Sequence, residues 1–384
     1  MSIEFRVEPG EASTRSLRAE VRAFIAAEKA AGVFVPRQNA WTRYNTEFSR
    51  HCGERGYIGM TWPRAYGGHE RPERERFVMC EEMLAVGAPV GAHWIADRQS
   101  GGQILRFGSE RLKRELLPPI AAGRCFFAIG MSEPDSGSDL ASVRTRALRA
   151  DGGWRIEGRK VWTTNAHLAH YLIALVRTSG PRQESDRRAG LTQMVVDLAS
   201  PGIEIRPILN ISGEREFNEV VFDGCFVPAD HVLGAVGEGW QAVTNELALE
   251  RSGPDRFLSL MPLMQLLVRA AAQSGSERAQ VEVGRLLAHL AALRGMSASV
   301  ATMIEKGGKP ETEAALVKDV GTSFEQETSE IARGLLPLLP DMSEDADPLA
   351  RAIAMAVLEA PSFTLRGGTR EILRGIIARG LGAR

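Results

Sequence analysis

The chain has 384 residues, of which 44% are hydrophobic and 25% charged, enough to bury a large core and to form two or three domains. Its formal net charge of -1 offers no electrostatic attraction to nucleic acid or to an anionic membrane. The four cysteines lie far apart without a CxxC pair, so they predict no disulfide framework and no metal site.

Targeting and membrane segments are not predicted either. The first residues, MSIEFRVEPGEAS, lack a charged region followed by an apolar stretch. No later segment approaches the roughly 18 uninterrupted apolar residues of a membrane span. We therefore expect a cytoplasmic protein.

The first third of the chain has helical periodicity, with apolar residues three and four positions apart. In the first of these segments the apolar face consists of Leu17, Val21, Phe24 and Ile25. Ser109, followed by Glu110, is typical of a helix N-cap. The predicted helices are 16–31, 42–55, 72–86, 90–107 and 109–117.

From residue 125 the pattern changes to short β-rich runs separated by Gly, Pro, Ser and Asp. Asp151-Gly152-Gly153 between two such runs indicates a hairpin. Several short strands at similar spacing predict a compact antiparallel barrel or sandwich. The predicted strands are 125–131, 143–150, 154–164, 171–177, 191–197, 203–208 and 219–227.

Helical periodicity returns near Trp240 and continues to the end of the chain. The predicted helices are 240–272, 277–305, 311–336, 348–358 and 369–379, with an acidic linker at 340–347. The sequence thus predicts an α+β protein with three domains. These are an N-terminal helical domain (1–124), a middle antiparallel β-barrel (125–236) and a C-terminal helical bundle (237–384).

Four motifs occur in order along the chain. They are Met131-Ser132-Glu133-Pro134-Asp135-Ser136-Gly137-Ser138-Asp139, then Gly158-Arg159-Lys160-Val161-Trp162-Thr163-Thr164-Asn165, then Phe222-Asp223-Gly224-Cys225-Phe226-Val227-Pro228, then Gly367-Gly368-Thr369-Arg370-Glu371-Ile372. Each motif alone is a weak signal, since turn-rich loops contain the same residue types. Together they span nearly the whole chain and resemble the acyl-CoA dehydrogenase family. The resemblance implies a flavoprotein of lipid β-oxidation that binds FAD.

The resemblance assigns residues to the cofactor and to the substrate. Met131, Ser132, Trp162 and Thr164 would surround the flavin ring, because fixed donors stabilise the negative charge that a flavin acquires with a hydride. Ser138 would line the acyl-CoA entrance. Thr369 would contact the flavin diphosphate, and the same residue type would cap the final helix. Trp162 as an ordinary core residue is the alternative.

Glu250 is the predicted catalytic base. In most of the family the base precedes Gly-Thr, where this chain has Gly367, whereas members resembling isovaleryl-CoA dehydrogenase carry it before an Arg on an earlier helix, as in Glu250-Arg251. Arg251 is assigned to substrate binding. The backbone N–H of Gly367 can still donate to a thioester carbonyl, so Gly367 stays among the predicted catalytic residues. The alternative for Glu250 is a solvated carboxylate paired with a nearby Arg.

Two stretches depart from the family pattern, and both concern contacts of FAD across a subunit interface. Members of the family usually have an Arg and a Phe-Gly pair where this chain has residues 268–276. They usually have a Gln followed by Gly-Gly where this chain has residues 330–337. Either the adenine end is held differently, or a second, non-identical subunit supplies what is missing. We therefore expect a homo- or hetero-oligomer, a dimer or tetramer.

The sequence as a whole predicts an FAD-dependent acyl-CoA dehydrogenase. It would form a 2-enoyl-CoA by α-proton abstraction and β-hydride transfer, and pass electrons to an electron-transferring flavoprotein. Two other functions remain open, namely a non-catalytic or half-site subunit of a heteromeric acyl-CoA dehydrogenase and an acyl-CoA oxidase-like flavoenzyme. The length and shape of the acyl group are not readable from the sequence.

Overall fold

The structure is a computed structural model that describes residues 3, 5–6, 12–180, 186–240, 242–243 and 251–383. Contacts within it divide the chain into two compact units. The first unit comprises Met1–Arg43, Arg71–Pro89 and Glu250–Arg384, and the second comprises Tyr44–Glu70 and Val90–Leu249. The segment expected to form one N-terminal domain contributes helices to both units. The three domain boundaries stay a prediction from the sequence.

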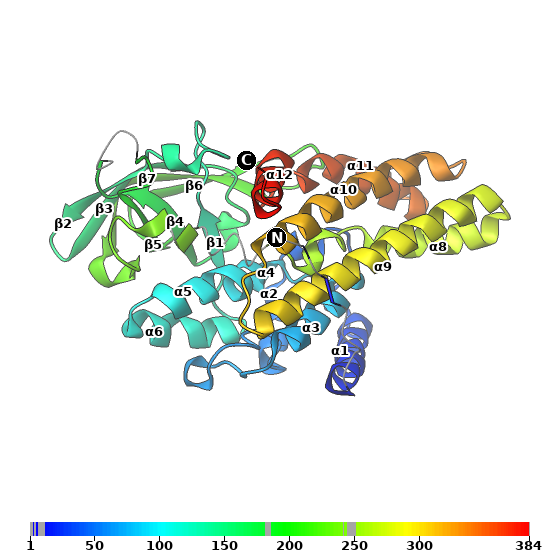
Figure 1. Ribbon diagram of the computed structural model, residues 1–384, viewed down its shortest axis with the longest axis horizontal. Coiled ribbons are helices and arrows are strands. Elements are labelled where there is room, and N and C mark those ends of the chain that lie inside the picture. Colours follow the sequence, from blue (N-terminus) through cyan, green and yellow to red (C-terminus); the bar gives the residue numbers. More distant parts are fainter. Residues whose placement is uncertain are drawn as a thin grey trace. The chain divides into compact units, whose positions relative to one another are not determined.

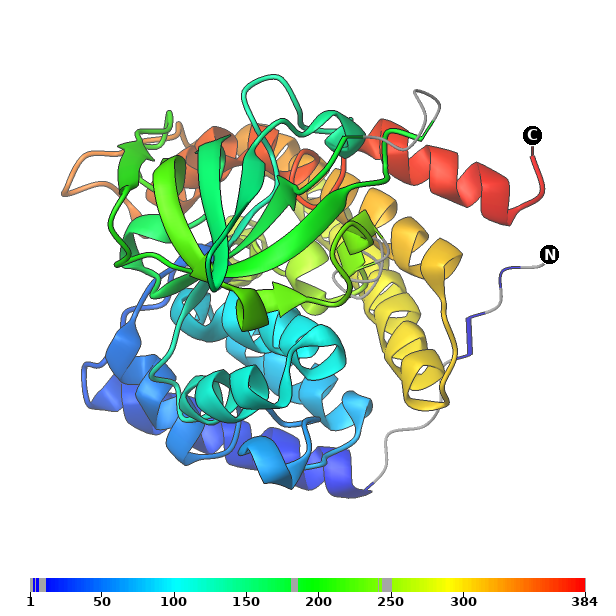
Figure 2. The same cartoon turned by 90° about the vertical axis from the view of Figure 1, so that its left-hand side faces the viewer.

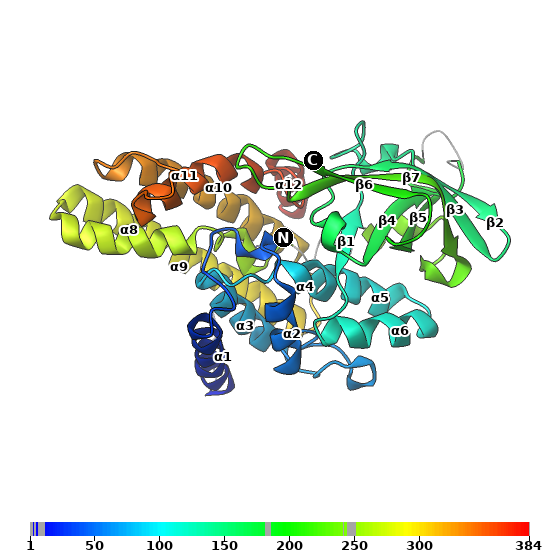
Figure 3. The same ribbon diagram turned by 180° about the vertical axis from the view of Figure 1, so that it is seen from behind.

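The first unit is built from helices, labelled in Figures 1 and 3. Helix α10 contacts α9, α11 and α12, and α8 contacts α9 and α11, so these helices form a bundle. Ser276 starts α9, since its side chain accepts a hydrogen bond of 3.2 Å from the Ala279 N–H. The helices are α1 (Ala12–Ala30), α3 (Glu73–Ala85), α8 (Met261–Ser274), α9 (Glu277–Glu305), α10 (Glu311–Leu335), α11 (Pro348–Phe363) and α12 (Arg370–Gly380).

The apolar face predicted for the first helix is confirmed. Leu17, Val21, Phe24 and Ile25 are all buried on α1, which packs against α3. This agreement follows from the period of the helix, which places residues three and four apart on one face.

By length and composition, α9 is the one helix in the described part of the chain that could cross a membrane. It packs against α3, α8 and α10. A core helix of a soluble protein passes the same test, so a single helix of this kind carries little weight.

Helices also accompany the sheet of the second unit. The Asn45 side chain accepts a 2.9 Å hydrogen bond from the Phe48 N–H and starts α2, and Ser109 caps α6 through the Leu112 N–H at 3.2 Å, as predicted. The predicted helix 90–107 is a helical run whose middle turn is a π-helix. These elements are α2 (Thr46–Glu54), α4 (Gly91–Ile95), the π-helix η3 (Ala96–Ser100), α5 (Gly101–Phe107) and α6 (Glu110–Ala121).

The strands of the second unit lie side by side in one twisted sheet, seen in Figure 2. The predicted hairpin is present, because β2 and β3 pair antiparallel across the turn at Asp151 and Gly152, where Gly152 has φ 71°. The strands are β1 (Phe127–Gly130), β2 (Arg146–Ala150), β3 (Gly153–Lys160), β4 (Tyr171–Arg177), β5 (Leu191–Asp197), β6 (Ile203–Ile208), β7 (Phe217–Pro228) and β8 (Val232–Leu233).

The predicted middle β domain is present, but its described strands form a sheet that does not close into a barrel. Their order is β6-β7-β3-β2-β4-β5-β8, with β1 paired to β4, and no pairing joins β6 to β8. The pairings of β4 with β1 and with β2 are parallel. Strand β8 pairs through only two residues, Val232 and Leu233, so it cannot continue the ladder around to β6.

The predicted continuous helix 240–272 is wrong. Residues 251–260 form turns and the 3-10 helix η7 (Pro254–Arg256), and α8 begins only at Met261. Gly253 and Pro254 explain the interruption, because proline lacks the N–H that an inner helical turn needs and clashes with the preceding turn.

Candidate active site

A buried ion pair anchors the loop that follows β1. The Lys160 ammonium at the end of β3 is fully buried and donates to Glu133 Oε1 at 2.8 Å and to the Met131 carbonyl at 3.1 Å. The Glu133 carboxylate also accepts from the backbone N–H groups of Arg144 at 2.7 Å and Thr145 at 2.9 Å. The pair therefore ties together the end of β1, the start of β2 and the end of β3.

Burial and pairing act in opposite directions on this pair. Burial lowers the pKa of Lys160 to about 8, although the carboxylate of Glu133 partly offsets the effect. Burial alone would raise the pKa of Glu133, but Lys160 and the hydrogen bonds to the carboxylate outweigh it, and the pKa of Glu133 is lowered. Both side chains are therefore charged at neutral pH.

The predicted flavin residues of the second unit come together beside this pair. The Val161 N–H donates to the Ser132 carbonyl at 2.9 Å, which joins the Met131–Ser132 loop to the segment that carries Trp162 and Thr164. Met131, Ser132 and Thr164 are half-buried, while Ser138 is exposed farther along the loop.

Trp162 is not a core residue, contrary to the alternative considered for it. Its side chain is 59% exposed, and its ring meets the edge of Phe217 at 6.0 Å between centroids and an angle of 87°. Trp162 and Asn165 have φ of 58° and 52°, in the left-handed region that side chains rarely adopt. The turn between them presents a large aromatic surface to solvent.

In the first unit, the structure brings Arg251 to the loop that contains Gly367. A Cβ added to Gly368 would lie 3.9 Å from Nη2 of Arg251, so the guanidinium borders the Gly367–Gly368 turn. These glycines have φ of 64° and 101°, and the buried Lys318 ammonium donates to the Gly368 carbonyl. Glu250, the predicted base, lies outside the described residues.

Thr369 occupies the N-cap position of α12, as predicted, but its side chain makes no capping hydrogen bond. The backbone N–H of Glu371 and, to a smaller extent, the Thr369 hydroxyl lower the pKa of the exposed Glu371 carboxyl group. The capping role predicted for the Thr369 side chain is thus wrong.

Arg366, which precedes Gly367, forms a polar cluster that the sequence analysis missed. Its Nη2 lies 3.0 Å from the fully buried Glu325 carboxylate and 2.9 Å from Ser259 Oγ, and its Nη1 lies 3.1 Å from Asn39 Oδ1. The guanidinium also stacks 4.8 Å from the Trp41 ring. Burial raises the pKa of Glu325, and Arg366 counteracts the shift.

His93 and Asp97 are buried in the second unit and serve its packing. His93 Nδ1 lies 2.8 Å from Ser49 Oγ, and burial lowers the pKa of His93 to about 3. Asp97 Oδ1 accepts a hydrogen bond of 2.7 Å from the Gly59 N–H. A neutral histidine tied to a serine and a carboxylate tied to a backbone amide agree with a core role.

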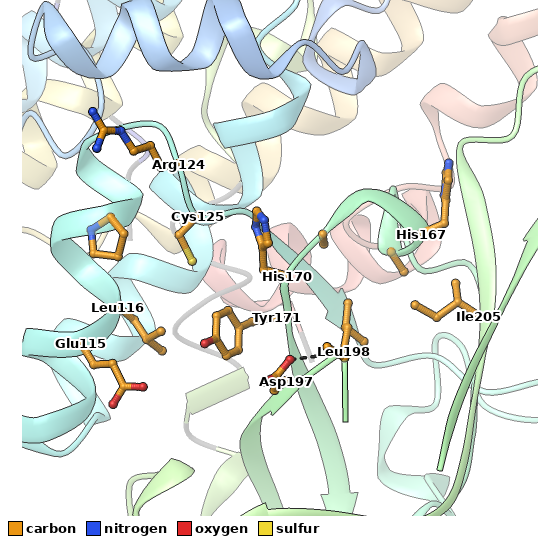
Figure 4. A pocket seen from close by; sticks show the side chains of 14 residues that line it. Glu115, Leu116, Arg124, Cys125, His167, His170, Tyr171, Asp197, Leu198 and Ile205 are labelled. Atoms are coloured by element: carbon orange, nitrogen blue, oxygen red, sulfur yellow. Dashed lines mark hydrogen bonds between the residues drawn. The ribbon is translucent and has the colours of Figure 1, made fainter. Parts of the chain in front are cut away.

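A pocket of 540 Å³ in the second unit lies apart from the predicted site residues, none of which line it (Figure 4). Its wall combines residues of α6, of the β4 and β5 ends and of the short helix η5 (Ala166–Leu168). His170 stacks on Phe126 with ring centroids 5.3 Å apart, and its Nδ1 accepts from the Phe126 N–H at 3.1 Å. The lining residues are Glu115, Leu116, Pro119, Arg124, Cys125, Ala166, His167, Ala169, His170, Tyr171, Asp197, Leu198, Ala199 and Ile205.

Comparison with known families covers almost the whole chain. Residues 11–124 match the model "Acyl-CoA dehydrogenase, N-terminal domain", residues 128–225 match the middle domain and residues 237–382 match the C-terminal domain.

Individual relatives of the chain are also acyl-CoA dehydrogenases. The chain is 30% identical over 374 residues to acyl-CoA dehydrogenase IpdE1 of Mycobacterium tuberculosis, covering 94% of this chain and 95% of that protein. It is 31% identical over 327 residues to acyl-CoA dehydrogenase FadE34 of the same organism, covering 85% of this chain but only 44% of that longer protein.

Two similar solved structures are each named after two proteins, and one of them is described as a complex. The steroid ACAD Tcur3481-Tcur3483 has a TM-score of 0.85 and 26% identity, with 98% of this chain and 99% of that chain covered. The ChsE4-ChsE5 complex from Mycobacterium tuberculosis has a TM-score of 0.84 and 26% identity, with 99% of each chain covered.

Proposed function

Because this chain belongs to the acyl-CoA dehydrogenase family, with all three of its domains, we propose that it oxidises an acyl-CoA to a 2-enoyl-CoA with Glu250 as base. The observation that carries the proposal is the position of Arg251, whose guanidinium borders the Gly367–Gly368 turn. Glu250 precedes Arg251 in the chain, and Gly367 stands where most relatives carry their base. In this proposal the carboxylate of Glu250 replaces the catalytic carboxylate that most relatives carry at the position of Gly367.

The residues around this turn have complementary roles in the proposal. Glu250 removes the α proton of the thioester, and its basicity rises when bound substrate excludes water. The N–H of Gly367 donates to the thioester carbonyl and stabilises the charge that develops on its oxygen. Arg251, which is buried, holds a positive charge beside the turn and binds the substrate.

FAD fits the described residues of the second unit. Trp162 offers an exposed ring for stacking, and the Ser132 and Thr164 side chains are half-buried beside it. Met131, Ser132, Trp162 and Thr164 would hold the flavin ring, and Thr369 would contact its diphosphate. When bound, the flavin supplies the acceptor for the β hydride. The family is FAD-dependent, and an electron-transferring flavoprotein is the proposed electron acceptor.

We further propose that the chain works in a hetero-oligomer on a bulky acyl-CoA. The segments that lack the usual FAD contacts are the end of α8 with the residues after it, 268–276, and the end of α10, 330–337. A second, non-identical subunit would supply the missing contacts. The ChsE4-ChsE5 complex and the steroid ACAD Tcur3481-Tcur3483 support this proposal. The candidate substrate is a CoA thioester with a steroid-type acyl group. The proposed location is the cytoplasm.

FAD binding is the direct test of this proposal. Purified alone and with each co-encoded homologous subunit, the protein is expected to bind FAD and to show the absorption bands of oxidised flavin in at least one preparation. Native mass then gives the subunit ratio, and bleaching of the bands by a steroid-type acyl-CoA identifies the substrate class. A protein that stays colourless with FAD and every such partner would contradict the proposed function.

Thr164→Val is expected to weaken FAD binding about five- to tenfold, because it removes one hydroxyl donor while keeping the side-chain shape. Thr163→Val is the matched control, since the buried Thr163 hydroxyl has no hydrogen-bond partner among the described residues. FAD titration of both variants followed by flavin absorbance compares them. Equal affinities for the two variants would remove Thr164 from the flavin site.

A further inference from the structure

The segment that carries Trp162 and Thr164 is held in an unfavourable backbone conformation. Trp162 and Asn165 account for two of the four non-glycine residues with positive φ in the described chain. Such residues persist only where surrounding contacts enforce them, and they concentrate at functional sites. Some part of the sheet must therefore hold the turn from Trp162 to Asn165.

The start of β7 provides these contacts. The Asn218 side chain donates through Nδ2 to the Thr163 carbonyl at 2.9 Å, while the Asn218 carbonyl accepts from the Thr163 N–H at 3.1 Å. Asn218 thus binds both backbone groups of the residue at the centre of the turn. The Asn165 N–H donates to the Glu216 carbonyl at 2.8 Å, and Phe217 packs its edge against Trp162.

Burial makes the Asn218 amide costly for the protein to keep. Asn218 and Thr163 are both fully buried, and Asn218 Oδ1 has no hydrogen-bond partner in the described part of the chain. A leucine or valine would fill such a position in a strand without an unsatisfied polar atom. Packing of the sheet therefore does not explain why an asparagine occupies this position. The hydrogen bond from its amide to the Thr163 carbonyl does.

We infer that Asn218 is a positioning residue for the flavin site, which fixes the Trp162–Asn165 turn through the Thr163 backbone. The inference rests on the proposed function for its connection to FAD. Asn218 is fully buried, so it acts through the Thr163 backbone and not by contact with a ligand. Its role is to keep Trp162 and Thr164 in the orientation that binds the ring before the cofactor arrives, which reduces the ordering required on binding.

The test compares Asn218→Ala with wild type in the assembly that binds FAD. We expect FAD affinity to fall about tenfold, the equivalent of about 1.4 kcal/mol from one lost hydrogen bond. We also expect faster amide hydrogen exchange in residues 161–166 of the FAD-free protein. Asn218→Leu, which fills the space, replaces the alanine variant in both measurements if that variant does not fold.

Asn210→Ala is the matched control. Asn210 lies in the connection between β6 and β7, shortly before the strand that carries Asn218. Its Oδ1 accepts from the N–H groups of Ser212 and Glu214, both at 3.0 Å, and it makes no bond to the Thr163 backbone. This variant should keep wild-type FAD affinity and wild-type exchange in residues 161–166. An equal loss of FAD affinity in both variants would mean that any loosening near the start of β7 weakens FAD binding. That result would overturn the specific role of Asn218.

The two measurements separate the inference from the proposed function. If wild type binds FAD and the Asn218 variants bind it within twofold, with unchanged exchange in residues 161–166, the positioning role is wrong. If wild type binds no FAD in any assembly, the proposed function fails. Hydrogen exchange then still decides whether Asn218 fixes the turn: faster exchange in the variants supports it, and unchanged exchange rejects it.

Discussion

Glu250→Gln is expected to slow reduction of the flavin by acyl-CoA about 10⁴-fold or more, while FAD and acyl-CoA still bind. The glutamine keeps the size of the side chain but cannot accept the α proton, and general bases contribute about 10² to 10⁴ in rate. The loss should reach the upper end of that range or exceed it, because the proton leaves a weakly acidic carbon. Anaerobic mixing with the best acyl-CoA, followed through the flavin band, measures the effect.

The same change at Glu246, four residues earlier in the sequence, is the control. Glu246→Gln removes an equal charge from the same run and should leave the reduction rate within a fewfold of wild type. If Glu250 were only a surface ion-pair partner, its variant would cost about 1 kcal/mol of stability or less and would reduce normally. Reduction of the Glu250→Gln flavin within a fewfold of wild type would therefore end the assignment of Glu250 as base.

Arg366→Met is expected to lower the free energy of unfolding by about 3–5 kcal/mol, because it leaves the buried Glu325 carboxylate without its counter-charge. The Glu325 side chain is fully buried, and its other oxygen accepts a 2.8 Å bond from the neutral Ser259 N–H. Adding Glu325→Leu should recover most of the loss, since an apolar pair needs no compensation. Urea or thermal unfolding measures each variant.

The pH dependence of the Arg366→Met deficit has a definite sign. Burial already raises the pKa of Glu325 in the folded wild type, and loss of the guanidinium should raise it further. A raised folded pKa favours the folded state while the carboxyl is protonated, and this contribution is lost as pH rises through the folded pKa. The deficit relative to wild type should therefore be smaller at pH 5 than at pH 8.

Arg333→Met provides the comparison for an exposed ion pair. Arg333 lies 2.6 Å from Glu330 on the same helix, with both side chains more than half exposed. Its loss should cost about 0.5 kcal/mol or less and show little dependence on pH. A deficit for Arg366→Met as small as that for Arg333→Met would show that the buried pair contributes no more than a surface pair.

Part of the protein could be read directly from its sequence. The order of helical, β and helical segments was correct because the periods of 3.6 and 2 depend only on neighbouring residues. The apolar face of α1, the Ser109 cap and the hairpin at Asp151 and Gly152 are local features of the same kind. The family followed from motif residues whose order could be read along the chain.

Two predictions about secondary structure and sheet closure differ from the structure, for different reasons. The helical period from 240 to 272 was followed across Gly253 and Pro254, although proline disfavours an inner helical turn. The barrel or sandwich was inferred from strand number and spacing, which do not reveal that β8 pairs through only two residues. Closure depends on pairing between the first and last strands, and no nearby residues encode it.

The polar interior was decided by the tertiary structure alone. Lys160 and Glu133 are 27 positions apart, and Arg366 and Glu325 are 41 apart, yet each pair meets in the core. Periodicity cannot reveal such pairs, because a charged residue on a helix or strand resembles a solvent-exposed one until its partner folds against it. The sequence by itself therefore determined which residues are available for the chemistry, whereas the long-range burial of charges and amides determined how their loops are held.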